Sequence, residues 1–398
     1  MFNEFKNIGQ KLKTSNSNKK VSATPTSDKA KARKQLLKVV GIVSGVLIVI
    51  FLGFLLLTII IGRNYSYEQI EQILKNAGVK YYKIQEVLLP SSDGEKSEVD
   101  ASTLSSEEYK LMKPLSKLKK NAVCTGKVVV QKINNDFVYT PYLDCGDKYK
   151  TEELYKAVID KNKIMTSGNG LYEMNGEYVF RGETVNNYLK LSQGLFRIVK
   201  ITSDNKILLI PQFDEYYSGV WDDRYNSEAA YNTGINSYQL SRVRTVLNTL
   251  YSAKIDNLVL LSDNDRQKLT SFSLCIGKRG KDEENNSGSI ECSDTMDNQM
   301  IGLLTAADYI NASIDSNCKK TTSKSCQNYN YLKVKGIPWW LLTADGNKTS
   351  DVYYVSGDGY IVSSNALNYN YVRPTIMLNN NVMIKSGNGT ENAPFILK

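Results

Sequence analysis

The chain has 398 residues, 50 of them Lys or Arg and 41 Asp or Glu, and it contains no His. The absence of His excludes Ser-His-Asp and Cys-His catalysis and metal sites built on imidazole. Ten basic and two acidic residues lie within positions 1–38, so the remainder holds forty basic and thirty-nine acidic residues and does not favour a nucleic-acid partner.

Positions 39–61 carry no charged side chain and form the first predicted element. A helix of this length measures roughly 34 Å at about 1.5 Å per residue, enough to cross a hydrocarbon core of about 30 Å. The flanking charge is basic on the N-terminal side, which orients such a span with its N-terminus inside. We therefore expect a flexible basic cytoplasmic tail at 1–38, a transmembrane helix at 39–61, and an extracellular C-terminal domain on a single-pass protein of the cell membrane. A buried soluble helix, a cleaved signal peptide and a prepilin leader are the alternatives.

Residues 62–120 follow the apolar stretch and are expected to form a juxtamembrane helical stalk. Ser66 suits a helix N-cap, and apolar residues including Ile70 and Leu74 follow it at helical spacing. Positions 90–106 are rich in Ser, Asp and Gly, which predicts a linker within the stalk.

Residues 121–150 carry the pattern of a β-hairpin. β-Branched and aromatic residues dominate its two arms, at 127–131 and 137–143, around a turn at 134–136. A disulfide at the open end would stabilise a two-stranded unit that is otherwise marginal.

All six cysteines lie beyond the apolar stretch, in the region expected to be exported. An even number there favours disulfides over free thiols, and zinc-finger spacing is missing. Of the fifteen pairings that six cysteines allow, we predict those between sequence neighbours, each contributing roughly 3 kcal/mol by loop closure. These pairs are Cys124–Cys145, Cys275–Cys292 and Cys318–Cys326.

Residues 151–398 show short strands and helices, which predicts an α+β surface domain. Asn175-Gly176 is a strong hairpin turn signal. An apolar stripe at 240–250 indicates an amphipathic helix, and Ser262 can cap a further helix. Positions 277–298 are polar and Gly-rich, as expected of a long surface loop.

Six blocks within residues 187–397 resemble a family of bacterial surface domains of unknown function, many of which are membrane-anchored. The blocks are Asn187-Tyr188-Leu189 with Phe196-Arg197-Ile198-Val199, Ile301-Gly302-Leu303 with Asp308-Tyr309, Trp339-Trp340-Leu341, Val355-Ser356-Gly357, Val372-Arg373-Pro374, and Gly387-Asn388-Gly389 with Pro394-Phe395. The resemblance implies a C-type-lectin-like fold of the formylglycine-enzyme type. Leu342 and Phe196 depart from the family, which has Arg and Trp at these places.

Taken together, these features predict an α+β protein with one transmembrane helix, juxtamembrane helices, a disulfide-closed β-hairpin and a β-rich C-type-lectin-like domain. Carboxylate pairs for hydrolysis would have to come from Asp222, Asp223 or Asp358, whose spacing does not indicate a catalytic pair. We expect no enzyme activity, no cofactor and no metal.

Tyr and Asn residues gather between positions 353 and 371 and suit adaptable surface recognition, since rings give contact area and amides give hydrogen bonds. The candidate ligand-binding residues are Tyr353, Tyr354, Asp358, Asn365, Asn368, Tyr369, Asn370 and Tyr371. The blander interpretation is that alternate Tyr residues fill the core. We expect a non-catalytic binding protein for a cell-wall glycan, a host glycan or a protein partner. The alternative is a structural or sensory subunit of a membrane assembly.

Overall fold

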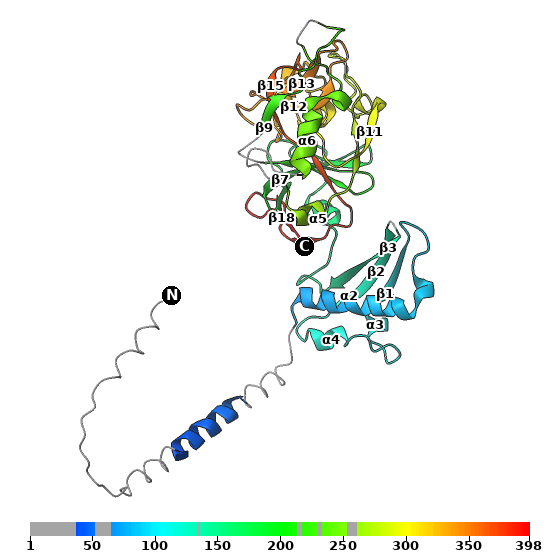
Figure 1. Cartoon of the computed structure of the whole chain (residues 1–398), viewed down its shortest axis with the longest axis vertical. Helices are drawn as coiled ribbons and strands as arrows, with labels where there is room; N and C mark the ends of the chain where they lie inside the picture. The colour runs from blue at the N-terminus through cyan, green and yellow to red at the C-terminus, as the bar shows by residue number, and fades with distance from the viewer. Residues whose placement is uncertain (1–36, 52–64, 134, 213–216, 230–232, 253–260) are drawn as a thin grey trace, which may run out of the picture.

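The computed structural model describes residues 37–51, 65–133, 135–212, 217–229, 233–252 and 261–398. Beyond a helix over residues 37–51, the described chain forms two bodies (Figure 1). The first body, the hairpin module, contains α2 (Tyr67–Ile84), η1 (Glu86–Leu88), β1 (Lys96–Asp100), α3 (Ala101–Leu104), α4 (Leu115–Leu118), β2 (Thr125–Ile133) and β3 (Asp136–Asp144). The second body, the cavity module, contains everything from residue 151 onward.

The predicted transmembrane helix is not supported. The described part of the apolar stretch is helical over residues 37–51, a length of about 22 Å at 1.5 Å per residue, and positions 52–61 lie outside the described residues. Among the residues that the structure describes, no helix has both the length and the apolar character that a membrane crossing requires. The prediction of a single-pass membrane protein is therefore wrong, together with the membrane partner and the extracellular placement that depended on it. The flexible tail predicted at 1–38 lies outside the described residues except for its last two positions.

The helix predicted after Ser66 is confirmed as α2, but it is not a stalk. The Ser66 hydroxyl accepts a hydrogen bond from the backbone N–H of Gln69, and the Gln69 side-chain oxygen accepts one from the backbone N–H of Ser66, so the first turn is closed by a capping box. The apolar stripe of α2 packs on the sheet β1-β2-β3 and is fully buried at Ile70 and Leu74. The linker predicted at 90–106 instead supplies the edge strand β1, which pairs with β2 in antiparallel register.

The predicted hairpin at 121–150 is confirmed as β2 and β3, with Cys124 and Cys145 joined at its open end. Its turn includes Asn135 at a φ of 69°, a conformation that Asn tolerates better than most residues. Gly78 of α2 allows the helix to lie directly against Val128 of β2, because a Cβ there would stand only 2.6 Å from the Val128 side chain. The helix and the sheet thus form one compact unit with its own core.

The cavity module is built from two larger sheets, a two-stranded ribbon and short helices. Its elements are α5 (Leu154–Lys161), β4 (Gly170–Met174), β5 (Glu177–Arg181), β6 (Tyr188–Leu191), β7 (Gly194–Ile201), β8 (Ile207–Pro211), β9 (Tyr217–Val220), η2 (Tyr238–Leu240), α6 (Arg242–Ser252), α7 (Asp263–Arg266), β10 (Phe272–Cys275), η3 (Glu291–Ser293), β11 (Thr295–Gln299), α8 (Ala306–Ala312), η4 (Lys324–Gln327), β12 (Trp339–Ala344), β13 (Asp351–Val355), β14 (Ile361–Asn365), β15 (Tyr369–Val372), β16 (Ile376–Leu378), β17 (Ile384–Ser386) and β18 (Phe395–Leu397). The α+β class is confirmed.

The first large sheet has eight strands, with the path β16-β8-β7-β6-β18-β17 and the β4–β5 hairpin attached through β5 to β7. The predicted turn at Asn175-Gly176 joins β4 to β5, and both residues have positive φ, as a tight hairpin requires. Strand β7 is buried along most of its length, yet it carries Lys200 among apolar residues. This exception places a charge on the inside of the module.

The second large sheet has the order β14-β13-β12-β15-β9 and holds the aromatic core. Trp339 and Trp340 open β12 and are both completely buried, and the Trp340 ring meets the Trp221 ring edge-on at 5.9 Å between centroids. Arg373 lies at 4.7 Å from the Trp339 ring, counted from its guanidinium carbon, and donates hydrogen bonds to the carbonyls of Leu332 and Pro211. The carbonyl of Pro211 belongs to β8, so Arg373 ties the first sheet to the second.

The two modules are joined by a small polar network around residue 151. The Glu71 carboxylate on α2 accepts hydrogen bonds from the Thr151 hydroxyl and, at 2.6 Å, from Lys398 Nζ. The same Lys398 Nζ donates to the Tyr149 hydroxyl at 2.8 Å, and the Tyr149 ring stacks on Tyr67 of α2. These contacts connect the first helix of the hairpin module with the last residue of the chain.

Candidate functional site

The Tyr and Asn residues predicted to bind a ligand do not share one surface. Tyr353 and Asn370 are buried, and the Tyr353 hydroxyl donates to the backbone carbonyl of Arg279. Tyr354, Asn365 and Tyr371 are half-buried, and the Tyr354 ring meets that of Trp340 edge-on. Only Asp358, Asn368 and Tyr369 are exposed, with 76% of Tyr369 accessible. The segment therefore contributes mainly to the core, with Tyr369 as its one large exposed ring.

The candidate hydrolytic carboxylates occupy different environments. Asp222 is completely buried and pairs with Arg224 at 2.8 Å, while one of its oxygens accepts from the backbone of Ile235. Asp223 pairs with Arg242 at 2.8 Å on the surface. Asp358 lies in the exposed turn between β13 and β14. The carboxylates of Asp222 and Asp223 are each paired with an Arg. Such pairing does not suit general acid or base chemistry.

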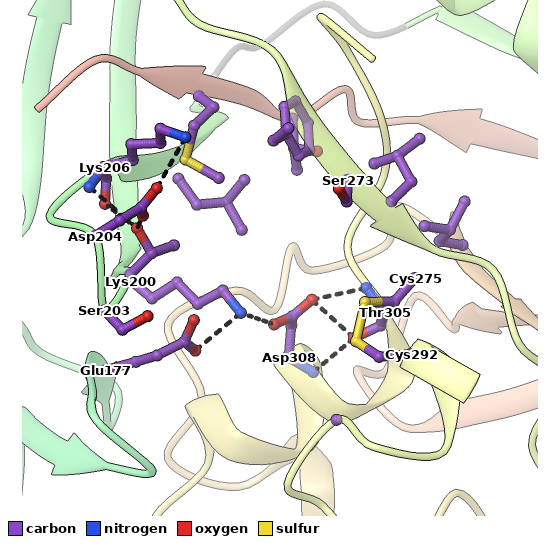
Figure 2. Close-up of a pocket in the computed structure, with 18 of the residues that line it drawn as sticks. Glu177, Lys200, Ser203, Asp204, Lys206, Ser273, Cys275, Cys292, Thr305 and Asp308 are labelled. Carbon is purple, nitrogen blue, oxygen red and sulfur yellow. Dashed lines mark hydrogen bonds and ion pairs between the residues drawn. A yellow bond between two sulfur atoms is a disulfide. The ribbon is translucent and has the colours of Figure 1, made fainter. Parts of the chain in front are cut away.

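A cavity of about 910 Å³ lies elsewhere in the cavity module. Its walls come from the β4–β5 turn, the end of the β7–β8 hairpin, the ribbon β10–β11 and the first turn of α8. Figure 2 shows the β7–β8 side facing the Cys275–Cys292 disulfide and α8 across this space. Segments from residue 175 to residue 377 therefore converge on one hollow.

The lining of the cavity combines apolar and polar side chains. The apolar side chains are Leu208, Phe272, Leu274, Leu303, Leu342 and Met377. Seven Ser and Thr residues, among them Ser273 and Thr375, stand on the walls with four carboxylates and two lysines. Cavities of this size and mixed lining are the usual places for small ligands or ligand segments.

Lys200 spans the bottom of the cavity and is held by two carboxylates (Figure 2). Its Nζ lies 3.1 Å from Glu177 and 3.5 Å from Asp308, and 24% of its side chain is exposed. Burial alone would lower the pKa of Lys200, but the charges of Asp308 and Glu177 outweigh it and raise the pKa to about 12. The ammonium is therefore charged at neutral pH.

Asp308 also belongs to the capping box at the start of α8. It is residue N3 of α8, and its Oδ2 accepts from the backbone N–H of Thr305 at 2.9 Å, while the Thr305 hydroxyl caps Asp308 in return. The capping box fixes the carboxylate, so that its Oδ1 remains directed at Lys200. The charge at the cavity floor is thereby set by the helix start and not by a flexible side chain.

The outer rim carries a second ion pair and an acid, Asp297, for which the described residues offer no cation in an ion pair. Lys206 Nζ lies 2.8 Å from Asp204, whose other oxygen accepts from the Thr202 hydroxyl. Burial acts to raise the pKa of Asp204, but hydrogen bonds from Lys206 and Thr202 outweigh it and hold that pKa below its usual value. On the ribbon, the Ser273 hydroxyl donates to Asp297 at 2.6 Å.

The wall formed by η3 and α8 is anchored by a buried ion pair. Arg279 and Glu291 are both completely buried and form two bonds, of 2.8 Å and 3.1 Å. Glu291 also accepts from the backbone N–H of Ala307, next to Asp308, and is followed directly by Cys292. The predicted disulfides are confirmed at Cys275–Cys292, Cys318–Cys326 and Cys124–Cys145. The loop predicted at 277–298 is thus pinned, although its end forms β11.

Most of the blocks that carry the family resemblance are structural, whereas Leu303 and Asp308 of one block line the cavity. Asn187 and Arg197 are buried, joined at 2.5 Å, and the Arg197 guanidinium lies 3.8 Å above the Tyr188 ring. Trp339, Trp340 and Arg373 form the aromatic core described above. The cavity residues were missed by sequence reasoning, and one signal could have found them: Lys200 interrupts the apolar run of β7.

All six cysteines are in disulfides, and Lys200 is held protonated. In the ranges that the structure describes, no group of three or more Cys, Asp or Glu is placed to hold a metal ion. The arrangement can bind a polar ligand through hydroxyls, amides and charges.

Comparison with known proteins places part of this site within a recognised domain. Residues 205–380 match the model of a family described as a domain of unknown function, DUF6273. No curated protein and no solved structure matches the chain. The matched range includes the ribbon, α8 and most of the cavity wall, while Glu177 and Lys200 precede it. The expectation of a domain of unknown function is confirmed in this coarse form, and the C-type-lectin-like fold finds no support among solved structures.

Proposed function

We propose that the chain is a non-catalytic binding protein and that its ligand occupies the cavity between the β7–β8 hairpin and the ribbon β10–β11. The observation that carries this proposal is the lining, which joins apolar side chains to hydroxyls and to ion pairs that are already formed. Such a surface recognises a polar molecule with an apolar face. A glycan or an extended peptide segment meets this description.

The chemistry of the site favours binding over catalysis. A general acid or base works best with a pKa near the working pH. The pKa of Lys200 lies far above neutral pH, and the pKa of Asp204 lies below its usual range. The capping box and the buried pair Arg279–Glu291 already hold the wall of the cavity in place. A site that is ordered before binding loses less conformational entropy when its ligand binds.

The exposed ring of Tyr369 is the competing place for a ligand. It is the largest exposed member of the Tyr and Asn segment, and rings stack on sugars. It stands alone, however, since its neighbour Asn370 is buried and Tyr371 is half-buried. We therefore place the ligand in the cavity and keep Tyr369 as a matched alternative for the experiment.

Binding of the full chain to an array of oligosaccharides and peptides tests the proposal. Ser273→Trp would fill the cavity mouth from an exposed position on the ribbon, and Tyr369→Ala removes the competing ring. We expect the bound ligands to be lost with Ser273→Trp and kept with Tyr369→Ala. The opposite pattern would move the site to β15, and an array without any bound class would reject the binding function.

A subunit role remains a prediction that no contact described here favours. Stable co-purification of one partner by the full chain, unaffected by Ser273→Trp, would support it against a cavity ligand.

A further inference from the structure

We infer that the ligand of this cavity carries a positively charged group, an ammonium or a guanidinium. This inference rests on the proposed function of the same cavity. The inference starts from the charges that line it. Four carboxylates, those of Glu177, Asp204, Asp297 and Asp308, face the ammonium groups of Lys200 and Lys206. The lining therefore has two negative charges in excess.

The excess lies at two separate points. At the floor, Lys200 is shared between two carboxylates, closely with Glu177 at 3.1 Å and more loosely with Asp308 at 3.5 Å. At the rim, the Asp297 carboxylate accepts from the Ser273 hydroxyl at 2.6 Å, and none of the described cations is placed in an ion pair with it. A ligand cation could pair with Asp297 without displacing any existing ion pair.

A second observation is independent of the carboxylates. Thr375 lines the cavity and is 1% exposed, and among the described residues its hydroxyl oxygen has no hydrogen-bond partner. Leaving a buried hydroxyl unsatisfied costs about 1–3 kcal/mol. Its backbone N–H and carbonyl are already bonded to Gly302, so the hydroxyl is the group left to meet a ligand. The combination of an unsatisfied hydroxyl and surplus negative charge selects a polar ligand with a cationic end.

The lysines do not make the cavity an anion site. Lys206 is engaged by Asp204 at 2.8 Å, and Lys200 is engaged from two sides. An anionic ligand would have to break one of these pairs and would add to the negative surplus. A cation would form a charge-assisted hydrogen bond with Asp297 without breaking an existing ion pair.

Two matched probe pairs, applied to the full chain by titration calorimetry, test the charge requirement. One pair is a lysine hexapeptide and its Nε-acetylated form at neutral pH, and the other is a glucosamine hexamer and its N-acetylated form at mildly acidic pH. Within each pair, acetylation removes the positive charge of each nitrogen and adds one acetyl group to it. We expect at least one cationic member to bind roughly tenfold more tightly than its acetylated form, as one charge-assisted hydrogen bond predicts.

Two rim variants give opposite predictions. Asp297→Asn should weaken the cationic probe about tenfold, and Lys206→Gln should tighten it several-fold because Asp204 becomes free. Both positions are on the rim, and retention of the circular dichroism spectrum controls for folding. Equal affinities within both probe pairs, failure of both cationic probes to bind, or an unaltered Asp297→Asn variant would overturn the inference. Binding of neutral or acidic array ligands that Ser273→Trp abolishes would, in that case, leave the proposed function standing.

Discussion

The most demanding prediction concerns the buried pair that anchors the cavity wall. Glu291→Gln keeps the shape of the side chain and an acceptor for Ala307, but it leaves the Arg279 guanidinium charged and completely buried. Removing one partner of a buried ion pair typically costs about 3–5 kcal/mol in the free energy of unfolding. For a module of this size, about 2–4 °C per kcal/mol converts the loss into a fall of roughly 6–20 °C in Tm.

Tryptophan fluorescence reports this loss selectively. Trp221, Trp339 and Trp340 are the three tryptophans of the chain, and all are completely buried in the cavity module. Thermal and urea unfolding under non-reducing conditions, followed by their emission, therefore measures the module that contains the pair. The hairpin module, which has no Trp, does not contribute to the signal.

Two controls separate the buried charge from a general effect of mutation. Asp204→Asn breaks an exposed pair with Lys206 in the same module and should cost less than about 1 kcal/mol. Arg279→Met combined with Glu291→Leu removes both charges and should recover most of the stability. A Glu291→Gln variant no less stable than Asp204→Asn, or a double variant as unstable as the single one, would refute the reasoning.

Three further perturbations have directions fixed by the structure. The pKa of Lys200 is raised to about 12 from its ordinary value of 10.5, so its ion pairs stabilise the fold by about 2 kcal/mol below pH 10.5 and lose this contribution as the pH rises through 12. The stability difference between wild type and Lys200→Met should shrink over that window in urea titrations. Gly387→Ala should cost at least about 2 kcal/mol, measured by thermal unfolding, because φ is 99° there and an added Cβ would overlap the Pro394 carbonyl. Glu71→Gln removes the negative charge that pairs with Lys398 Nζ and should increase proteolysis between the two modules while leaving the tryptophan emission unchanged.

Each of these has an outcome that contradicts it. A Lys200→Met difference that stays constant from pH 9 to beyond 12 would remove the ion pairs as its cause. Gly387→Ala should be compared with Gly146→Ala, where φ is also positive but no atom lies within 4 Å of the added Cβ, and equal losses would exclude the steric term. Unaltered cleavage of Glu71→Gln would show that the network around Thr151 does not hold the modules together.

The parts of the fold that could be predicted are those decided by neighbours in sequence. Ser66 and Gln69 lie within one turn of α2, and Asn175-Gly176 is a turn by itself. The cysteine pairs are separated by 21, 17 and 8 residues, so chain proximity already favoured the observed connectivity. In each case the deciding contact is local and its chemistry can be recognised from residue type.

The features that were missed depend on partners distant in sequence, or on a sequence criterion that is necessary but not sufficient. β1 carries a polar sequence and is a strand because β2 offers it an edge. The ribbon strand β11 is mostly exposed, so hydrophobic alternation could not mark it. The stretch at 39–61 carries no charged residue. A membrane helix requires this, but the lack of charge does not suffice to establish one.

The cavity could not be found because its chemistry is distributed over the chain. Glu177, Lys200 and Asp308 meet at the floor, although Asp308 is more than a hundred residues away from the other two. Nothing in the local sequence of Asp308 distinguishes a capping residue from a cavity residue, and it is both. Lys200 was informative, since a charge within the buried strand β7 requires partners. The other charge of β7, Arg197, has its partner Asn187 within the core.

The positions of the resemblance blocks bear directly on where specificity lies. Asn187, Arg197, Trp339 and Arg373 are buried and hold the two sheets together, so a related chain must keep them in order to fold. The polar residues of the cavity lie mostly in turns and on the exposed ribbon, for example Asp204, Ser273 and Asp297. These positions can change without disturbing the core, because surface substitutions away from buried networks usually alter stability by less than about 0.5 kcal/mol. Chains that share the blocks should therefore share the fold while differing in ligand, and the charges around the cavity are the quantity to compare among them.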